Sequence, residues 1–448
     1  MNHNEIDQYL KELTNVNNCF DIVRGEVGDN TIVYYVSSLV DLKLIQQVYQ
    51  LMENCNETYF GNIQKSTSID EIITSILSGL LFVLPKDDNK DYYLIETRNY
   101  PTRGISEPAT EQTIKGSKDG FCESIITNVG LIRRRIRSPS LLFEKYQFGI
   151  SSKTDVILTY LKDRVDNDYL SKIKNNLINN IDSVDSIVMG DKAIEEILFE
   201  QKYNLFPLVK YSERPDIVCT QILKGKIALI IDNSSSVIIT PTNAFEQIKH
   251  IEEYQHNPIV GSFLRCIRFI AILFSLFFVP LWLSLIKDND FQSIFIYPES
   301  MTFKTIFWQV IVVELMIEIL RIATIHTPSK LSSTMGLVSA LILGQFAVEI
   351  GVFSKEILLY CSLSAIGGFA TPSYELSLAN KITKIFLLIF VGILGKIGLL
   401  ISIFIIFLYL VNLNSKITPY LYPFIPFELN EFMQIFSRLG KEQKKRVR

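Results

Sequence analysis

The chain has 448 residues, a formal net charge of −3, 48% hydrophobic residues and 20% charged residues. A positive mean hydropathy at that share of charge indicates that two unlike regions are averaged together. The near-neutral charge gives no sign of nucleic-acid binding, because there is no basic stripe with interleaved aromatic residues. Residues 1–30 are polar and acidic, which predicts no signal peptide and an N-terminal half that stays inside the cell.

The sequence carries no constellation typical of an enzyme, a metal site or a cofactor site. Its six cysteines form no CxxC pair, which fits a reducing compartment and neither a disulfide framework nor a zinc site. The phosphate-binding GxxxxGK[ST], zinc-binding HExxH and hydrolase GxSxG motifs are missing. His250 and His256 lie near each other, but in a polar linker where solvated side chains are expected. We predict no catalytic residue, no metal and no cofactor.

Residues 1–101 predict a small α/β subdomain. β-branched and aromatic residues at 31–36 indicate a strand, and residues 42–52 have the apolar spacing of a helix. Residues 80–84 and 92–96 flank a polar turn, which predicts a hairpin.

Residues 102–258 predict a second α/β subdomain, because strand and helix patterns alternate again. The expected helices cover residues 120–135, 169–181, 192–201 and 217–223, and the expected strands cover residues 155–161, 186–189, 226–231 and 237–240. The last two strands flank a polar turn and predict a second hairpin.

Residues 259–427 predict a transmembrane domain of four to six helical segments, followed by a basic cytoplasmic tail at 428–448. A transmembrane helix needs about 20 mostly apolar residues. The clear candidates are residues 263–286, 337–353, 357–373 and 385–411. The last run is longer than a hydrocarbon core of about 30 Å requires, so it must tilt, protrude, or kink near Gly392, Gly395 and Gly398. The predicted fold class is an α/β soluble N-terminal region of two subdomains followed by an all-α transmembrane bundle.

Residues 305–325 are apolar over much of their length but carry Glu314, Glu318 and Arg321. Positions i, i+4 and i+7 share one helical face, and charged groups rarely face lipid. The face is either a set of ion pairs buried between helices or the lining of a polar cavity or pore. Gln345 and Glu349 interrupt the next apolar run and are further candidates for an intramembrane polar role.

The charges at the two ends of the chain predict the membrane topology. The basic tail is expected on the cytoplasmic side, like the N-terminal half, so the number of spans must be even. Four spans with residues 305–325 re-entrant or interfacial satisfy this requirement. Six spans need an extra crossing from residues 385–423.

Several unrelated motifs occur in one order between residues 80 and 426. They are RGISEP at 103–108, Glu111, GSKDGFCESIITNVGLIRRRI at 116–136, SERPD at 212–216, LKGKIALIID at 223–232, Glu314 with EILR at 318–321, Pro328, Gly344-Gln345 and PYL at 419–421. In this order they resemble the GerA family, the A subunits of spore germinant receptors. Ile322 departs from the family pattern, which has an acidic residue after the helix arginine.

The resemblance implies a subunit of a nutrient-germinant receptor in the inner spore membrane, with both chain ends on the core side. Such subunits act with a transporter-like B subunit and a lipoprotein C subunit, and are proposed to oligomerise into a ligand-gated ion channel. Two alternatives remain open from the residues: a secondary transporter, and a membrane scaffold that relays a signal without a pore of its own. No repeat is found among the predicted spans, and four spans are too few to enclose a substrate, which favours a homo-oligomer.

Two charged motifs of the α/β region are candidates for subunit contacts. The first is the triplet Arg133, Arg134 and Arg135, and the second is the group Glu213, Arg214 and Asp216. Guanidinium groups donate several hydrogen bonds to carboxylates, and Glu107, Glu111 and Glu123 are possible partners. The arginine triplet belongs either to a structural salt-bridge network or to a subunit contact or gating element. The second group is predicted to begin a helix, with Pro215 in its first turn.

Overall fold

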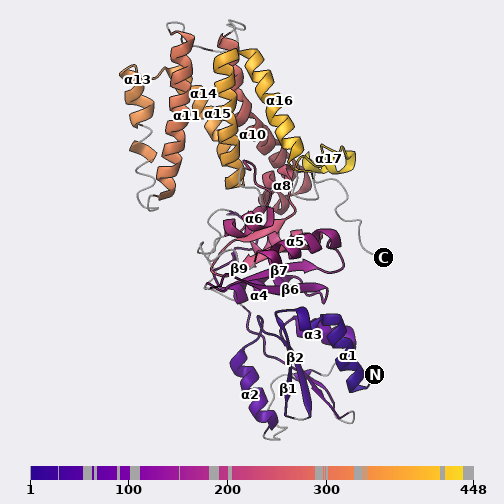
Figure 1. Cartoon of the computed structure of the whole chain (residues 1–448). Coiled ribbons are helices and arrows are strands. Elements are labelled where there is room, and N and C mark those ends of the chain that lie inside the picture. The colour runs from indigo at the N-terminus through magenta and orange to yellow at the C-terminus, as the bar shows by residue number, and fades with distance from the viewer. Residues whose placement is uncertain are drawn as a thin grey trace. The chain divides into compact units, whose positions relative to one another are not determined.

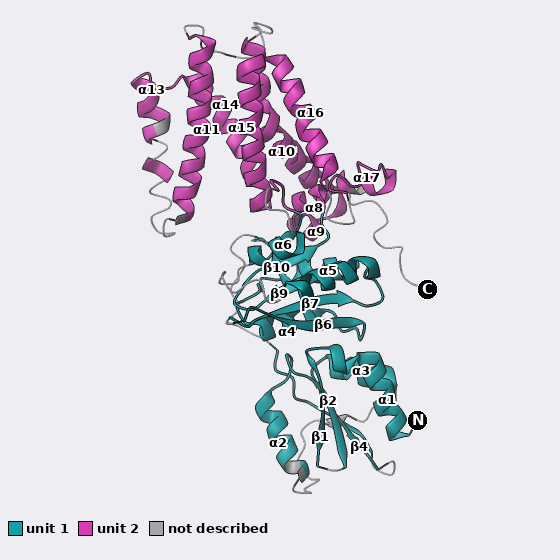
Figure 2. Cartoon of the chain, viewed as in Figure 1, with its two compact units in different colours: residues 1–203, 208–242, 415–417 teal, residues 204–207, 243–414, 418–448 magenta. Residues whose placement is uncertain are grey.

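The computed structural model describes residues 2–28, 30–53, 63–64, 68–87, 91–100, 111, 113–150, 152–180, 191–199, 204–287, 296, 298, 301–326, 336–338, 341–413 and 419–436. The chain divides into two compact units (Figure 2). Unit 1 comprises residues 1–203, 208–242 and 415–417, and unit 2 comprises residues 204–207, 243–414 and 418–448. The main division after Thr242 lies ahead of residue 258, where the composition changes.

The first sheet of unit 1 has five antiparallel strands in the order β1-β2-β4-β5-β3 (Figure 1). The elements are α1 (His3–Thr14), η1 (Val16–Asn18), β1 (Ile22–Val27), β2 (Thr31–Val36), α2 (Leu42–Glu53), β3 (Ile63–Gln64), α3 (Ile69–Leu77), β4 (Leu81–Pro85) and β5 (Tyr93–Ile95). Val33, Tyr34 and Leu84 are completely buried at its centre, where β-branched and aromatic side chains pack well. The predictions of β2, α2 and the β4–β5 hairpin are confirmed, whereas β1, β3, α1 and α3 are additional.

The second sheet of unit 1 also has five antiparallel strands, in the order β6-β7-β9-β10-β8. The elements are α4 (Ile125–Arg135), β6 (Leu141–Phe148), β7 (Thr154–Leu161), α5 (Asn167–Asn179), α6 (Asp191–Phe199), β8 (Lys210–Ser212), α7 (Pro215–Leu223), β9 (Ile227–Ile231) and β10 (Val237–Thr240). The predicted β9–β10 hairpin is confirmed, and β6 and β8 are additional. The helix predicted from residue 120 begins at Ile125, and the strand predicted at 186–189 lies outside the described residues.

The regular elements described in unit 2 are all helices. Its elements are α8 (Ala244–Ile248), α9 (Glu252–Gln255), α10 (Pro258–Lys287), α11 (Phe303–His326), the π-helical segment η3 (Leu341–Phe346), α13 (Ala347–Glu349), α14 (Lys355–Phe369), α15 (Tyr374–Leu394), α16 (Lys396–Asn412) and α17 (Leu429–Phe436). By length and composition α10 and α15 could each cross a membrane, and α16 is a shorter apolar helix.

The apolar run at residues 385–411 predicts one long helix with a tilt or a kink, and the single helix is wrong. α15 ends at Leu394, α16 begins at Lys396, and the two helices pack side by side (Figure 1). Gly395 between them has φ +66°, a conformation that glycine adopts readily because it lacks a Cβ. The run therefore supplies two helical segments, as the six-span alternative requires.

The long helices of unit 2 run in two opposite directions. The side chain of Lys287 at the end of α10 donates hydrogen bonds to the carbonyl oxygens of Gly392 and Ile393 at the end of α15, so these helices run in parallel. Gly392 also packs against Phe307 near the start of α11, which therefore runs the opposite way. Trp282 in α10 lies 4.7 Å from the ring of Tyr360 early in α14, so α14 runs antiparallel to α10.

Candidate functional site

Glu314 forms the centre of a buried polar cluster in unit 2. Its side chain is 0% exposed and accepts hydrogen bonds from the ammonium groups of Lys381, at 2.5 Å, and Lys384. The ammonium group of Lys384 also donates to the hydroxyl of Ser364 at 2.7 Å, which donates to the carbonyl oxygen of Ser275 at 2.8 Å. One chain of polar contacts thus joins α11, α15, α14 and α10. Lys381 and Lys384 are not among the candidate residues predicted from the sequence.

Small residues on α14 let the helices of this cluster approach closely. A Cβ atom on Gly367 would lie 2.6 Å from the carbonyl oxygen of Ala271 in α10, which is too close for any other residue. A Cβ atom on Gly368 would lie 3.0 Å from the hydroxyl of Ser275, a tight contact with a side chain. A larger side chain at Gly367 would push α14 away from α10 and separate Ser364 from Ser275.

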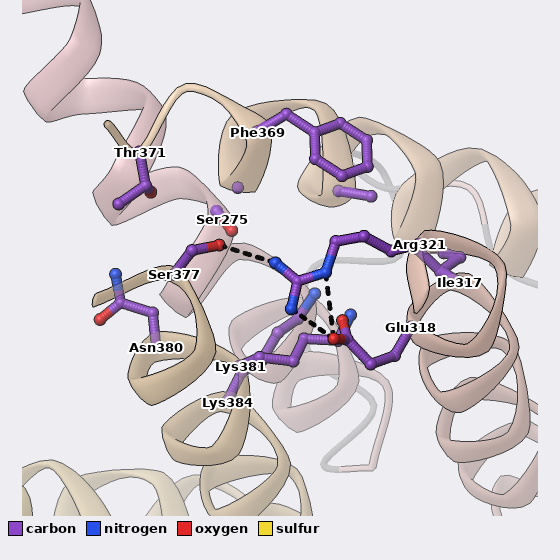
Figure 3. A pocket seen from close by; sticks show the side chains of 12 residues that line it. Ser275, Ile317, Glu318, Arg321, Phe369, Thr371, Ser377, Asn380, Lys381 and Lys384 are labelled. Atoms are coloured by element: carbon purple, nitrogen blue, oxygen red, sulfur yellow. Dashed lines mark hydrogen bonds and ion pairs between the residues drawn. The ribbon is translucent and has the colours of Figure 1, made fainter. Parts of the chain in front are cut away.

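Glu318 and Arg321 lie one turn further along the same face of α11. The guanidinium group donates to the Glu318 carboxylate, with an Nε–O distance of 3.0 Å, and to the Ser377 hydroxyl at 3.3 Å. It also lies 5.2 Å from the centre of the Tyr374 ring. The shared face predicted for Glu314, Glu318 and Arg321 is present, but Glu314 pairs with Lys381 and Lys384 of α15. Glu318 pairs with Arg321 (Figure 3).

Gln345 and Glu349 lie apart from that cluster. The Gln345 amide donates to the Glu349 carboxylate at 3.2 Å across the junction of η3 and α13, and both side chains are exposed. Gly344 beside them has open space where a Cβ would stand. A π-helical segment is uncommon and is often found at functional sites.

The side chain of Arg133 in unit 1 has its hydrogen-bond partners within the chain. Its guanidinium group and the Asp21 carboxylate are both 0% exposed, and they share hydrogen bonds of 2.6 and 2.9 Å. Further donors reach the carbonyl oxygens of Ser138 and Leu141. Since Asp21 directly precedes β1 and Arg133 belongs to α4, the pair ties the parts of the chain that carry the two sheets.

Arg214 is also completely buried, as the N-cap residue of α7. It pairs with Asp216 at 2.8 Å and donates to the carbonyl oxygens of Glu111 and Ser117. Burial raises the pKa of the Glu111 carboxyl, which accepts a hydrogen bond from the Ser212 hydroxyl. Arg214 and Asp216 thus form an ion pair within the chain, and a subunit contact through either residue stays a prediction. The carbonyl oxygen of Glu213 accepts a hydrogen bond from the N–H of Phe121.

Arg134 and Arg135 differ from Arg133. Arg135 is partly buried and pairs with Asp119. Burial by itself would raise the pKa of the Asp119 carboxyl, but hydrogen bonds from Arg135 and Ser117 outweigh burial, so the net effect is a lowered pKa. Arg134 is exposed, and its guanidinium carbon lies 4.7 Å from the centre of the Tyr100 ring. Arg134 is the member of the triplet left at the surface, and a contact with another subunit stays a prediction for it.

Among the described residues, no group of three or more His, Cys, Asp or Glu side chains could hold a metal ion. The most developed polar site is therefore the buried cluster of α10, α11, α14 and α15. Unit 1 is an α/β part, with two sheets and the helices that belong to them. Unit 2 is a helical part that encloses buried charges, and two of its helices are long and apolar enough to cross a membrane.

Comparison with known proteins places the chain in a family. The model of the Bacillus/Clostridium GerA spore germination protein matches residues 8–448, so this chain belongs to the GerA family, as its motifs indicated. Stage V sporulation protein AF of Bacillus subtilis (strain 168) is 41% identical over 86% of this chain and 78% of that protein. Spore germination protein KA of the same organism is 28% identical over 90% and 75%.

A solved structure is also similar. The crystal structure of the N-terminal domain of the A subunit of the Bacillus megaterium spore germinant receptor GerK3 matches with 25% identity and a TM-score of 0.38. The match covers 52% of this chain and 92% of that domain.

Proposed function

We propose that this protein is a membrane-embedded subunit of a nutrient-germinant receptor and forms an oligomeric, ligand-gated ion channel that triggers spore germination. Membership of the GerA family and the similarity to spore germination protein KA support a role in spore germination. The proposal includes the B (transporter-like) and C (lipoprotein) subunits as partners, and the inner spore membrane as the location.

Exposed apolar side chains on the helices of unit 2 support the membrane location. α10 exposes Phe263, Ile267 and Ile270, and α16 exposes Leu400 and Phe404, each by 40% or more. Continuous apolar faces of this kind are rare on soluble monomers and typical of contact with lipid or protein. With α15 and α16 as separate helices, unit 2 offers six helical segments. They are α10, α11, the segment whose described helical residues are 336–338 and 341–349, α14, α15 and α16.

With an even number of crossings both ends of the chain lie on the same side, and the basic tail supports the core side. A cysteine placed at Ser437 should therefore resist an impermeant thiol reagent added outside intact cells that express the protein. Labelling of that cysteine from outside would contradict the topology.

The exposed pair of Gln345 and Glu349 is the observation that carries the channel proposal. A carboxylate on an apolar segment costs several kcal/mol if it faces lipid, so this face should meet water or another subunit. Repetition of the pair around an oligomer would produce a ring of carboxylates, which is a usual way to line a cation pore. Within a single protomer the pair encloses nothing.

A flux assay tests this proposal. Purified protein in liposomes, with and without its partner subunits, should pass monovalent cations, and Glu349→Gln should reduce the flux severalfold while oligomer size is unchanged. Glu356→Gln, which removes an acid from the first turn of α14, is the matched control. Equal flux for wild type and Glu349→Gln would exclude this face as the pore lining. Solute uptake driven by an ion gradient would favour a transporter, and no flux of either kind would favour a signal-relaying scaffold.

The 41% identity to stage V sporulation protein AF supports a second candidate, a role during sporulation itself. Deletion of the gene distinguishes the two. A receptor subunit should leave spore formation normal and slow the response to nutrients, whereas a sporulation protein should reduce the yield or maturation of spores.

A further inference from the structure

A small polar pocket of about 40 Å³ lies beside the Glu314 cluster, between α10, α11, α14 and α15. Its charged lining consists of Glu318, Arg321, Lys381 and Lys384 (Figure 3). Glu314 lies behind the two lysines. Three cations therefore face two anions, which leaves a net charge of +1 in an apolar bundle. Uncompensated charge is costly in such surroundings unless a counter-ion is present.

The hydrogen-bond donors of the pocket are only partly used. Each ammonium group has three N–H donors. Among the described residues, Lys381 gives one donor to Glu314, and Lys384 gives one to Glu314 and one to Ser364. Thr371 also lines the pocket, and its buried hydroxyl has no hydrogen-bond partner in the described part of the chain.

Among the described residues, Glu318 is the one acidic side chain in the pocket lining, so no further acid there balances this excess. Glu375 is the nearest acid along α15, but it accepts a hydrogen bond from Ser373 and is not part of the lining. The amide of Asn380 and the hydroxyls of Ser275 and Ser377 complete the polar wall with neutral groups. The volume holds a few water-sized atoms, which limits the ligand to a very small one.

We propose that this pocket binds one small anion, either a halide or the carboxylate group of a small organic acid. The anion would accept hydrogen bonds from the ammonium groups and from Thr371, and would neutralise the cluster. The site lies within one protomer, so anion binding goes beyond the channel proposal and does not depend on a pore. Because the anion would join α15 to Thr371 in the turn that follows α14, binding should stabilise the packing of the helices around it.

Anion-dependent thermal unfolding of the purified full chain in detergent tests this site. At constant ionic strength, chloride and acetate should each raise the unfolding midpoint relative to gluconate, which is too large for the pocket. Lys381→Met brings the net charge of the cluster to zero and should weaken chloride binding at least tenfold. Glu318→Gln brings the net charge to +2 and should strengthen chloride binding. Lys304→Met removes an exposed positive charge from α11 outside the pocket and should leave the chloride dependence unchanged.

The opposite signs of the two pocket variants separate binding from a merely structural role. If Lys381→Met does not fold, Thr371→Val should still weaken chloride binding, because it replaces only the hydroxyl by a methyl group. Midpoints that are equal in chloride, acetate and gluconate would overturn the proposal, as would a chloride effect lost equally in Lys304→Met. Failure of this test leaves the flux assay unaffected, because that assay depends on Glu349.

Discussion

Buried charges are balanced differently in the two units of this protein. In unit 1, Arg133 and Asp21 are paired one to one, and the remaining guanidinium donors reach carbonyl oxygens. In unit 2, one carboxylate, that of Glu314, serves two ammonium groups. The first arrangement is closed and suits a scaffold. The second has donors to spare, which suits a site that binds something or changes state.

The comparison also separates residues that look alike in sequence. Arg133 and Arg134 are neighbours in one basic triplet, yet one is fully buried and the other is exposed. Glu314 and Glu349 both interrupt apolar runs, yet one is enclosed by its own bundle and the other lies on an outer face. Burial decides which of these residues can meet a partner outside the chain.

Removal of the Glu314 charge should have the largest effect. Glu314→Gln leaves Lys381 and Lys384 without a carboxylate, and breaking a buried ion pair in this way costs about 3–5 kcal/mol. We expect much less assembled protein in membranes and a lower unfolding midpoint. Adding Lys384→Met should restore part of both. A double variant no better than Glu314→Gln would show that charge balance is not what the cluster provides.

Loss of the Arg133–Asp21 pair in unit 1 should reduce stability nearly as much. Arg133→Ala leaves Asp21 buried without a counter-charge, and we expect a loss of about 3–5 kcal/mol. Hydrogen exchange of the full chain should show faster exchange in both α4 and β1. Arg133→Met combined with Asp21→Leu removes both charges and should be milder than Arg133→Ala. Equal damage from the two variants would assign the effect to packing.

Edge strands limited what could be predicted of the fold. The central strand β2 and the β4–β5 and β9–β10 hairpins have dense β-branched or aromatic runs, so the sequence alone predicts them. β1 and β6 lie at the edges of their sheets. Edge strands tolerate polar residues, such as Arg24 in β1 and Lys145 in β6, so their apolar pattern is weak.

Distance along the chain limited what could be predicted of the site. The spacing on α11 places Glu314, Glu318 and Arg321 on one face. However, the lysine partners of Glu314 lie 67 and 70 residues away. Their positive charges argue against a transmembrane helix, so the predicted span began only after Lys384. The pairing of Arg133 with Asp21, 112 residues away, has no local signal either.

The first sheet should show a moderate dependence on acid. Burial raises the pKa of Asp7, but hydrogen bonds from Arg24, Lys11 and Tyr34 outweigh burial and lower it from 3.8 to about 2. The carboxylate therefore contributes stability that is present above pH 3.8 and is lost as the pH falls toward 2. Because part of this network faces solvent, we expect about 1–2 kcal/mol.

Asp7→Asn isolates that contribution. The difference in unfolding midpoint between wild type and Asp7→Asn should be present at pH 5 and should shrink toward pH 2. A difference that stays constant over this range would assign the effect of the variant to packing.

The smallest effect on stability is expected at Arg134, where the subunit-contact hypothesis is best tested. Reversal of all three arginines would unfold unit 1 through Arg133, so the triplet must be separated. Arg134→Glu removes an exposed group whose described contact is the Tyr100 ring, and it should change stability by no more than about 0.5 kcal/mol. If Arg134 meets another subunit, the same variant should lower the oligomer fraction in cross-linking or native mass spectrometry. Arg134→Lys, which keeps the charge, should retain more of the assembly. An unchanged oligomer with Arg134→Glu would contradict the hypothesis, since charge reversal inside an interface is strongly unfavourable.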